Sequence, residues 1–167
     1  MAQPANILNQ NISIKRLHEM RNYGGGILTH GLKEEILKKF ISHDHNLRSA
    51  IESAYENFLV LQKEKPDFLL QTEKEQIKLA QQNIVNFYAN ENVNPYVAIS
   101  AMGPWIVTLK GAVIYDCGGY GMLGLGHSPK LALNEIKKSH VMANVMTPSL
   151  SQMDFIDILK KEIGHSR

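Results

Sequence analysis

Five glycines lie within residues 116–129, between a run typical of a β-strand and a sequence typical of a helix start. Glycine allows the backbone to turn with positive φ or to approach another group closely. So many glycines raise the conformational entropy that is lost on folding. A site that needs close backbone approach explains this density better than chance does. We therefore expect residues 116–129 to belong to a binding or active site.

The residues on either side of this glycine-rich segment predict a hairpin and a helix. Trp105–Leu109 and Ala112–Asp116 are rich in β-branched and aromatic residues, and Lys110–Gly111 lies between them at the expected turn. Ser128–Pro129 places a hydroxyl at a helix N-cap and proline at the first helical position. We expect a β-hairpin, the glycine-rich segment and then a helix.

Two amphipathic helices are expected after the glycine-rich segment. The first has Leu133, Ile136 and His140 on one side, and the second carries an apolar stripe of Met153, Ile156, Leu159 and Ile163. The second begins after Thr147–Pro148, where Ser151 and Asp154 resemble a capping box. Gly164 suits the position that ends a helix.

The first part of the chain, residues 1–94, is predicted to be helical, although the pattern of residues 1–30 is ambiguous. One stripe begins after Lys33 and consists of Ile36, Phe40, Leu47, Ile51, Tyr55 and Phe58; a second follows Pro66 and consists of Ile77, Ala80, Ile84, Phe87 and Tyr88. His43 and His45 point to different faces of a continuous helix, so we interpret them as a polar break or solvated residues, not metal ligands. Gly24–Gly26 lacks the lysine of a phosphate-binding loop and is interpreted as a flexible loop.

Composition excludes several classes of function. The 18 basic and 16 acidic residues leave a net charge of +2, so nucleic acid is not an expected partner. The single cysteine, Cys117, forbids an internal disulfide, and we interpret it as a small residue beside a turn, not a reactive thiol. The sequence has no secretory signal pattern and no apolar run of membrane-spanning length. These features predict a cytoplasmic protein without membrane contact.

The order of hairpin, Asp-x-Gly-Gly-aromatic-Gly, Gly-His-x-Pro and helix resembles the N-terminal region of class III (ω-) aminotransferases. These are pyridoxal-phosphate enzymes of fold type I. The resemblance covers residues 103–163. The matching residues are Gly111, Asp116, Gly118, Gly119, Tyr120, Gly121, Gly126, His127 and Pro129. It implies an α+β fragment, with residues 1–94 as a helical N-terminal extension and residues 95–167 as the small-domain segment of an aminotransferase.

The resemblance also implies which residues contact substrate. Tyr120 matches a residue that lines the substrate pocket, and Gly118 and Gly119 would keep backbone bulk away from substrate and cofactor. Asn144 matches another position that faces the pocket, in a looser motif. His127 is expected to orient the segment through a ring hydrogen bond, without a catalytic role.

The cofactor implied by the family is pyridoxal 5'-phosphate. A lysine forms its Schiff base, an aspartate pairs with the pyridine nitrogen, and a Gly-Ser turn holds the phosphate. The resemblance places all three beyond Arg167, and no lysine of this sequence is assigned to the Schiff base. The seven-stranded sheet of the cofactor domain is also absent from the pattern. The chain is therefore expected to be truncated before that domain, with no catalytic residue of its own and no activity alone.

The function implied is transfer of an amino group from an amine or ω-amino acid to a keto acid, by an enzyme that is a homodimer. The role of residues 1–94 stays open among a lid, a dimer arm and a small-domain extension. Two other classes of function also stay open. One is a free-standing helical interaction module without catalysis, and the other is a protein that binds a small anion through the glycine-rich segment.

Overall fold

The structure is a computed structural model that describes residues 4–85, 96–117, 124–141 and 146–164, with side chains from residue 10 onward. The helices are α1 (Pro4–Asn22), α2 (Glu34–His43), α3 (His45–Glu64), α4 (Pro66–Leu70), α5 (Glu73–Gln81), α6 (Lys130–Ile136) and α7 (Leu150–Ile163). The strands are β1 (Ala98–Met102), β2 (Trp105–Thr108) and β3 (Val113–Tyr115). The described residues thus have an α+β fold, as the sequence predicts. They divide into two compact units, Met1–Pro129 and Lys130–Arg167.

The three strands form an antiparallel sheet in the order β1-β2-β3. The hairpin of β2 and β3 confirms the prediction, and Gly111 in its turn has φ +66°. The strand β1 was not predicted, although it pairs with β2 from Ala98 opposite Thr108 to Met102 opposite Trp105. All four residues of β2, the central strand, are buried, and α3 packs against this strand.

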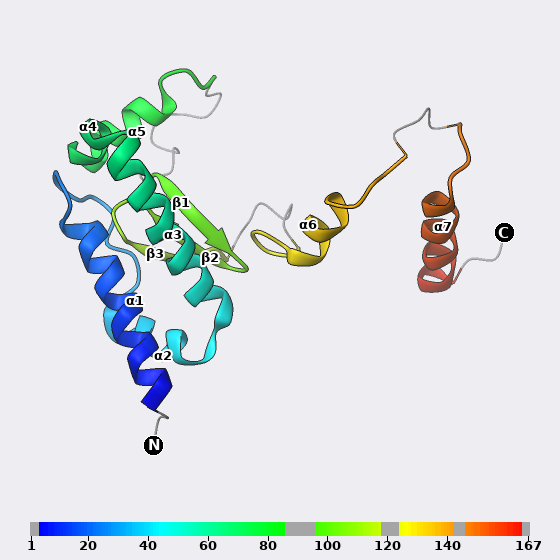
Figure 1. The fold of residues 1–167 in the computed structure, drawn as a ribbon, viewed down its shortest axis with the longest axis horizontal. Helices are drawn as coiled ribbons and strands as arrows, with labels where there is room; N and C mark the ends of the chain where they lie inside the picture. The colour runs from blue at the N-terminus through cyan, green and yellow to red at the C-terminus, as the bar shows by residue number, and fades with distance from the viewer. Residues whose placement is uncertain (1–3, 86–95, 118–123, 142–145, 165–167) are drawn as a thin grey trace. The chain divides into compact units, whose positions relative to one another are not determined.

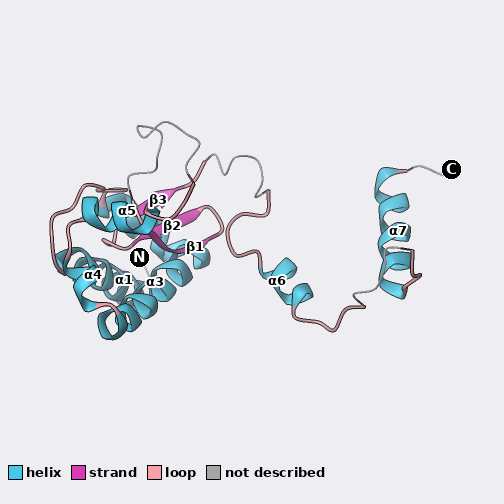
Figure 2. Cartoon of the chain, turned by 90° about the horizontal axis from the view of Figure 1, so that it is seen from above, coloured by secondary structure: helices cyan, strands magenta, loops and turns pink. Residues whose placement is uncertain are grey.

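The helices α1, α3 and α4 lie on one side of the sheet in the first unit (Figures 1 and 2). The helix α3 packs against β1 and β2, and α1 and α2 pack against α3 and against each other. Their shared core contains Leu17, Met20, Ile51, Phe58 and Trp105, each at most 3% exposed. The helical part and the hairpin therefore share one core.

The first predicted apolar stripe is correct in α3 and wrong in α2. Leu47, Ile51 and Phe58 are buried, as expected. In α2 the buried residues are Leu37 and Ile41, while the stripe residues Ile36 and Phe40 are 39% and 43% exposed. The two helices are separate elements, so the face that α2 presents to the core does not continue the face of α3.

Asp44 separates α2 from α3. This agrees with the interpretation of His43 and His45 as part of a polar break. The Asp44 Oδ1 atom accepts hydrogen bonds from the backbone N–H groups of Asn46 and Leu47, which caps α3. Its Oδ2 atom accepts a hydrogen bond of 2.7 Å from the indole N–H of Trp105. One carboxylate thus joins a helix start to the central strand of the sheet.

The second predicted stripe lies on the buried side of α5, where Ile77 is half-buried, but it extends further along the chain than the burial does. Pro66 begins α4, as expected, but α5 starts at a capping box of Thr72 and Glu75 and ends at Gln81. Its buried residues are Glu73 and Gln76. Ile84 lies beyond the helix and is 65% exposed, and Ala80 is exposed, while Phe87 and Tyr88 lie outside the described residues.

The helix starts predicted after the glycine-rich segment need two corrections. The helix α6 begins at Lys130, and Ser128 is not its N-cap: it has φ +50°, and its hydroxyl donates to the Ala101 carbonyl oxygen at 2.8 Å. The helix α7 is capped by Ser149, not Ser151, because the Ser149 hydroxyl accepts from the Gln152 N–H.

The second unit contains α6 and α7. Gly164 ends α7 in the left-handed conformation, with φ +70°, as predicted. The predicted apolar residues lie exposed on these helices and are Leu133, Ile136, Met153, Ile156, Leu159 and Ile163. None of the helices in the described part of the chain is both long and apolar enough to cross a bilayer.

Candidate functional site

The described ends of the glycine-rich segment meet at the edge of the sheet. The His127 ring nitrogen Nε2 lies 3.0 Å from Asp116 Oδ2, and both side chains are largely buried. The backbone of His127 pairs with Gly103 through hydrogen bonds of 2.9 and 2.8 Å. The Asp116 N–H donates to the Pro104 carbonyl oxygen at 2.7 Å. We call the contacts of Asp116, His127 and Gly103 the clamp. They agree with the structural role expected for His127.

Gly126 allows the two chain segments to approach so closely. It has φ +75°, and a Cβ built there would lie 2.9 Å from the Gly103 Cα atom. A side chain at Gly126 would therefore force the clamp apart. Gly126 is therefore needed for close backbone approach, which is one of the two roles that glycines were expected to have in this segment.

The residues predicted to contact substrate are Tyr120, Gly118, Gly119 and Asn144. All four lie outside the described residues, so their roles stay predictions. The neighbouring Cys117 is described: its thiol is exposed and lies 3.8 Å from the Tyr115 carbonyl oxygen. No group of three or more potential metal-ligating side chains lies together in the described parts of the chain, His43 and His45 included.

Pyridoxal 5'-phosphate needs a lysine that its aldehyde carbon can reach and a cradle for its phosphate. The buried lysine of the described residues is Lys110, which is 1% exposed. Its ammonium donates to the carbonyl oxygens of Tyr23 at 3.1 Å and Leu69 at 3.3 Å, and it lines none of the described pockets. Lys110 is therefore not available to this cofactor, and the resemblance assigns the Schiff base to none of the other lysines of the sequence.

Lys110 belongs to a buried polar cluster that also contains Glu73 and Gln76. Burial lowers the pKa of Lys110 below its usual 10.5, and the negative charge of Glu73 partly offsets this effect. The Glu73 Oε2 atom accepts from the backbone N–H groups of Leu28 at 2.6 Å and Thr29 at 2.8 Å. The cluster thus ties the hairpin turn and α5 to the segment that follows Gly24–Gly26.

Gly24–Gly26 is not the flexible loop expected from the sequence. A Cβ at Gly24 would lie 2.6 Å from the Leu69 carbonyl oxygen, and a Cβ at Gly25 would lie 2.6 Å from the Thr72 nitrogen. The Gly25 N–H also donates to the Leu70 carbonyl oxygen at 3.0 Å. Gly24 and Gly25 serve close packing of the loop against α4 and the start of α5, whereas a Cβ at Gly26 would meet nothing within 4 Å.

The buried cluster was missed by sequence reasoning. Lys110 lies in a hairpin turn, where a lysine is normally solvated, and Glu73 and Gln76 are polar residues that an apolar pattern does not mark as buried. The spacing of Thr72 and Glu75 is a capping-box signal that would have given the start of α5. Nothing local to Lys110 indicates that residues 23 and 69 surround it.

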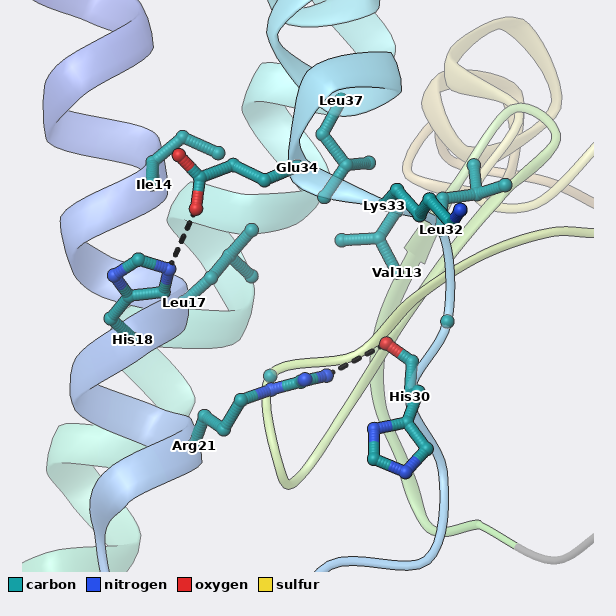
Figure 3. A pocket seen from close by; sticks show the side chains of 12 residues that line it. Ile14, Leu17, His18, Arg21, His30, Leu32, Lys33, Glu34, Leu37 and Val113 are labelled. Atoms are coloured by element: carbon teal, nitrogen blue, oxygen red, sulfur yellow. Dashed lines mark hydrogen bonds and ion pairs between the residues drawn. The ribbon is translucent and has the colours of Figure 1, made fainter.

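A pocket of about 240 Å³ lies between α1, the start of α2 and the hairpin (Figure 3). Its apolar wall consists of Ile14, Leu17, Leu32, Leu37 and Val113, and its polar residues are His18, Arg21, His30, Lys33 and Glu34. The α1 residues are spaced by three or four positions, so they share one helix face. Gly31 and Gly111 complete the lining.

Two polar contacts cross this pocket, and Figure 3 shows both. The His18 ring nitrogen Nε2 lies 3.0 Å from Glu34 Oε2. The Arg21 guanidinium donates to the His30 carbonyl oxygen at 2.8 Å. The pKa of Glu34 is lowered, first by its hydrogen bond with Lys38 and then by the charges of Lys38 and His18. Glu34 is therefore a carboxylate at neutral pH.

No protein-family model, no curated protein and no solved structure matches the chain. The family expectation therefore depends on the motif in residues 103–163.

Proposed function

We propose that this chain is the N-terminal portion of a class III aminotransferase, a pyridoxal-phosphate enzyme that moves an amino group from an amine or ω-amino acid to a keto acid. In this proposal the glycine-rich segment forms one wall of the substrate pocket. In this proposal the reacting lysine, the aspartate and the phosphate cradle come from polypeptide outside this sequence, as the resemblance implies.

The clamp is the observation that carries the proposal. The chain leaves the sheet at Asp116 and returns to it at His127, and the pair of Nε2 and Oδ2 atoms at 3.0 Å joins the two points. A binding segment that is held at both ends by a rigid scaffold keeps its residues in place for a ligand. Tyr120 and the two glycines before it lie between these fixed ends in the sequence.

The exposed apolar residues of α7 also support the proposal. The helix has a defined start and end, with Ser149 and Gly164 as its caps, yet none of its residues is buried. Its exposed large apolar residues are Leu150, Met153, Phe155, Ile156, Ile158, Leu159 and Ile163. Apolar surface of this extent is normally covered by another part of the protein or by a partner. We propose that the cofactor domain, in a homodimeric enzyme, covers it.

The test is to extend the reading frame beyond Arg167 and to express the longer chain with pyridoxal phosphate. The proposal predicts amino transfer from an amine or ω-amino acid donor to a keto acid. The Tyr120→Ala variant should change KM or donor preference, with little effect on folding. Leu125→Ala is the matched control, because Leu125 belongs to the same segment and is 75% exposed.

Two results would contradict the proposal. One is a longer chain that carries no lysine able to form an aldimine with the cofactor. The other is a set of kinetic constants that Tyr120→Ala leaves unchanged for several donors. The exposed surface of α7 would then favour the second candidate, a helical interaction module without catalysis, which a pull-down against defined partners would examine.

A further inference from the structure

We propose that the pocket between α1, residues 30–34 and the hairpin binds a small organic anion, a carboxylate with a short branched aliphatic chain. The carboxylate would contact Arg21, and the aliphatic chain would lie against Ile14, Leu17 and Leu37. This proposal does not depend on the aminotransferase proposal, because the pocket contains no residue of the glycine-rich segment.

The charge balance of the pocket favours an anion. Arg21 and Lys33 are permanent cations at neutral pH, and Glu34 is the acidic residue of the lining. The Glu34 carboxylate is already paired, at 2.6 Å with Lys38 and at 3.0 Å with His18. Because the charge of Lys38 balances that of Glu34, the positive charges of Arg21 and Lys33 remain uncompensated in this pocket.

Arg21 is the residue best placed to recognise a carboxylate. Its side chain is half-buried and extends across the pocket to the His30 carbonyl oxygen (Figure 3). Among the described residues, the His30 carbonyl oxygen is the hydrogen-bond acceptor of the Arg21 guanidinium. A guanidinium has several N–H donors in a planar arrangement, so others remain for a ligand. The hydrogen bond to His30 holds the guanidinium in one place, and its remaining N–H groups suit a carboxylate.

The apolar wall of the pocket favours a ligand whose other end is aliphatic. Ile14, Leu17 and Leu37 are at most 8% exposed and lie on the facing sides of α1 and α2. A volume of about 240 Å³ is below the range of about 300–1,000 Å³ that holds drug-sized ligands. The pocket therefore suits a metabolite-sized molecule with one charged end and one apolar end, and not a nucleotide.

The test is a calorimetric titration of the full 167-residue chain with 4-methylpentanoate at neutral pH and low salt. So small a ligand is expected to bind with a dissociation constant on the order of 1 mM. The uncharged 4-methylpentanamide has nearly the same shape and should bind at least about tenfold more weakly. Acetate has the charge without the apolar chain and should also bind more weakly.

Three variants locate the site. Arg21→Gln should weaken 4-methylpentanoate binding at least about tenfold, since it removes the charge and the planar fork. Arg16→Gln is the matched control on the same helix, because Arg16 pairs with Glu52 and lies outside this pocket. Glu34→Gln should strengthen binding about two- to fivefold, because it removes the negative charge that the anion meets.

The tighter binding of 4-methylpentanoate expected for Glu34→Gln cannot arise from a misfolded protein. Circular dichroism spectra identical to that of the parent chain would show that Arg21→Gln is folded. The proposal is overturned if the chain does not bind 4-methylpentanoate, or if the amide binds as well as the acid. It is equally overturned if Arg21→Gln binds as tightly as Arg16→Gln, or if Glu34→Gln fails to strengthen binding.

Discussion

Gly111 lies where the hairpin turn meets α1, and its replacement by alanine should destabilise the first unit strongly. Its φ is +66°, a conformation in which a residue with a Cβ costs about 1–2 kcal/mol. A Cβ at this position would also lie 2.4 Å from the Leu17 carbonyl oxygen and 3.3 Å from the Met20 Cβ atom. Ordinary contact begins near 3.4 Å, so the turn would have to move away from α1 by about 1 Å.

Such a displacement in a packed core costs about 1–3 kcal/mol, which brings the expected loss of unfolding free energy to about 2–5 kcal/mol. The assay is urea unfolding of the full chain, followed by far-ultraviolet circular dichroism. Gly103→Ala is the matched control in the same unit. It has a similar φ of +56°, but its added Cβ would meet the exposed side chain of Asn46, at 2.8 Å from Nδ2.

Because the Asn46 side chain can rotate away, Gly103→Ala should show the conformational cost of about 1–2 kcal/mol and little more. A larger loss for Gly111→Ala than for Gly103→Ala supports the close approach between the turn and α1. Equal losses in the two variants would refute it, since the contact with Leu17 would then carry no energetic weight.

The remaining predictions concern the buried polar contacts. Lys110→Met should lower the unfolding free energy by about 1–3 kcal/mol in the same urea assay, because it removes the ammonium that donates to the carbonyl oxygens of Tyr23 and Leu69. The folded-state pKa of Lys110 lies below 10.5, so the unfolded chain binds this proton more tightly, and its contribution to stability should rise as pH increases from the folded-state pKa towards 10.5. The stability difference between the parent and Lys110→Met measured across this range checks the sign, and a difference that falls with pH would contradict it. Trp105→Phe should cost about 1.5–3 kcal/mol, since it removes the indole donor to Asp44; a loss of the same size in the Asp44→Ala background would show that the hydrogen bond is not its cause.

The sequence predicts the parts of the fold that depend on near neighbours. The hairpin around Gly111 follows from β-branched arms and a glycine turn, and Gly164 ends α7 because its left-handed backbone is a local preference. The strand β1 could not be assigned in the same way, because its residues Ala98–Met102 include few β-branched side chains. Its pairing with β2 gives it strand structure.

Burial in α2 and α5 depends on distant residues, which the local pattern does not contain. Ile36 and Phe40 repeat at the same spacing as Leu37 and Ile41, so periodicity alone does not choose between the two faces of α2. Glu73 is buried because backbone N–H groups about 45 positions earlier in the chain solvate its carboxylate.

The candidate sites were predictable to different degrees. The glycine pattern indicated a segment with a structural His127, and the clamp agrees with that role. The pocket beside Arg21 was not predicted, because its walls come from α1, α2 and the hairpin, which lie far apart in the sequence. An arginine in the last turn of a helix has an ordinary explanation in the helix dipole, so its position alone gives no sign of a site.

The clamp has a consequence for how the glycine-rich segment can vary. Asp116 and His127 fix its two ends, so the free energy of lengthening it is mainly that of closing a longer loop. This entropy grows slowly, by about 0.6 kcal/mol for each doubling of loop length. Insertions between Cys117 and Gly126 should therefore be tolerated without loss of the sheet, and the segment can acquire new lengths and side chains while its scaffold stays unchanged.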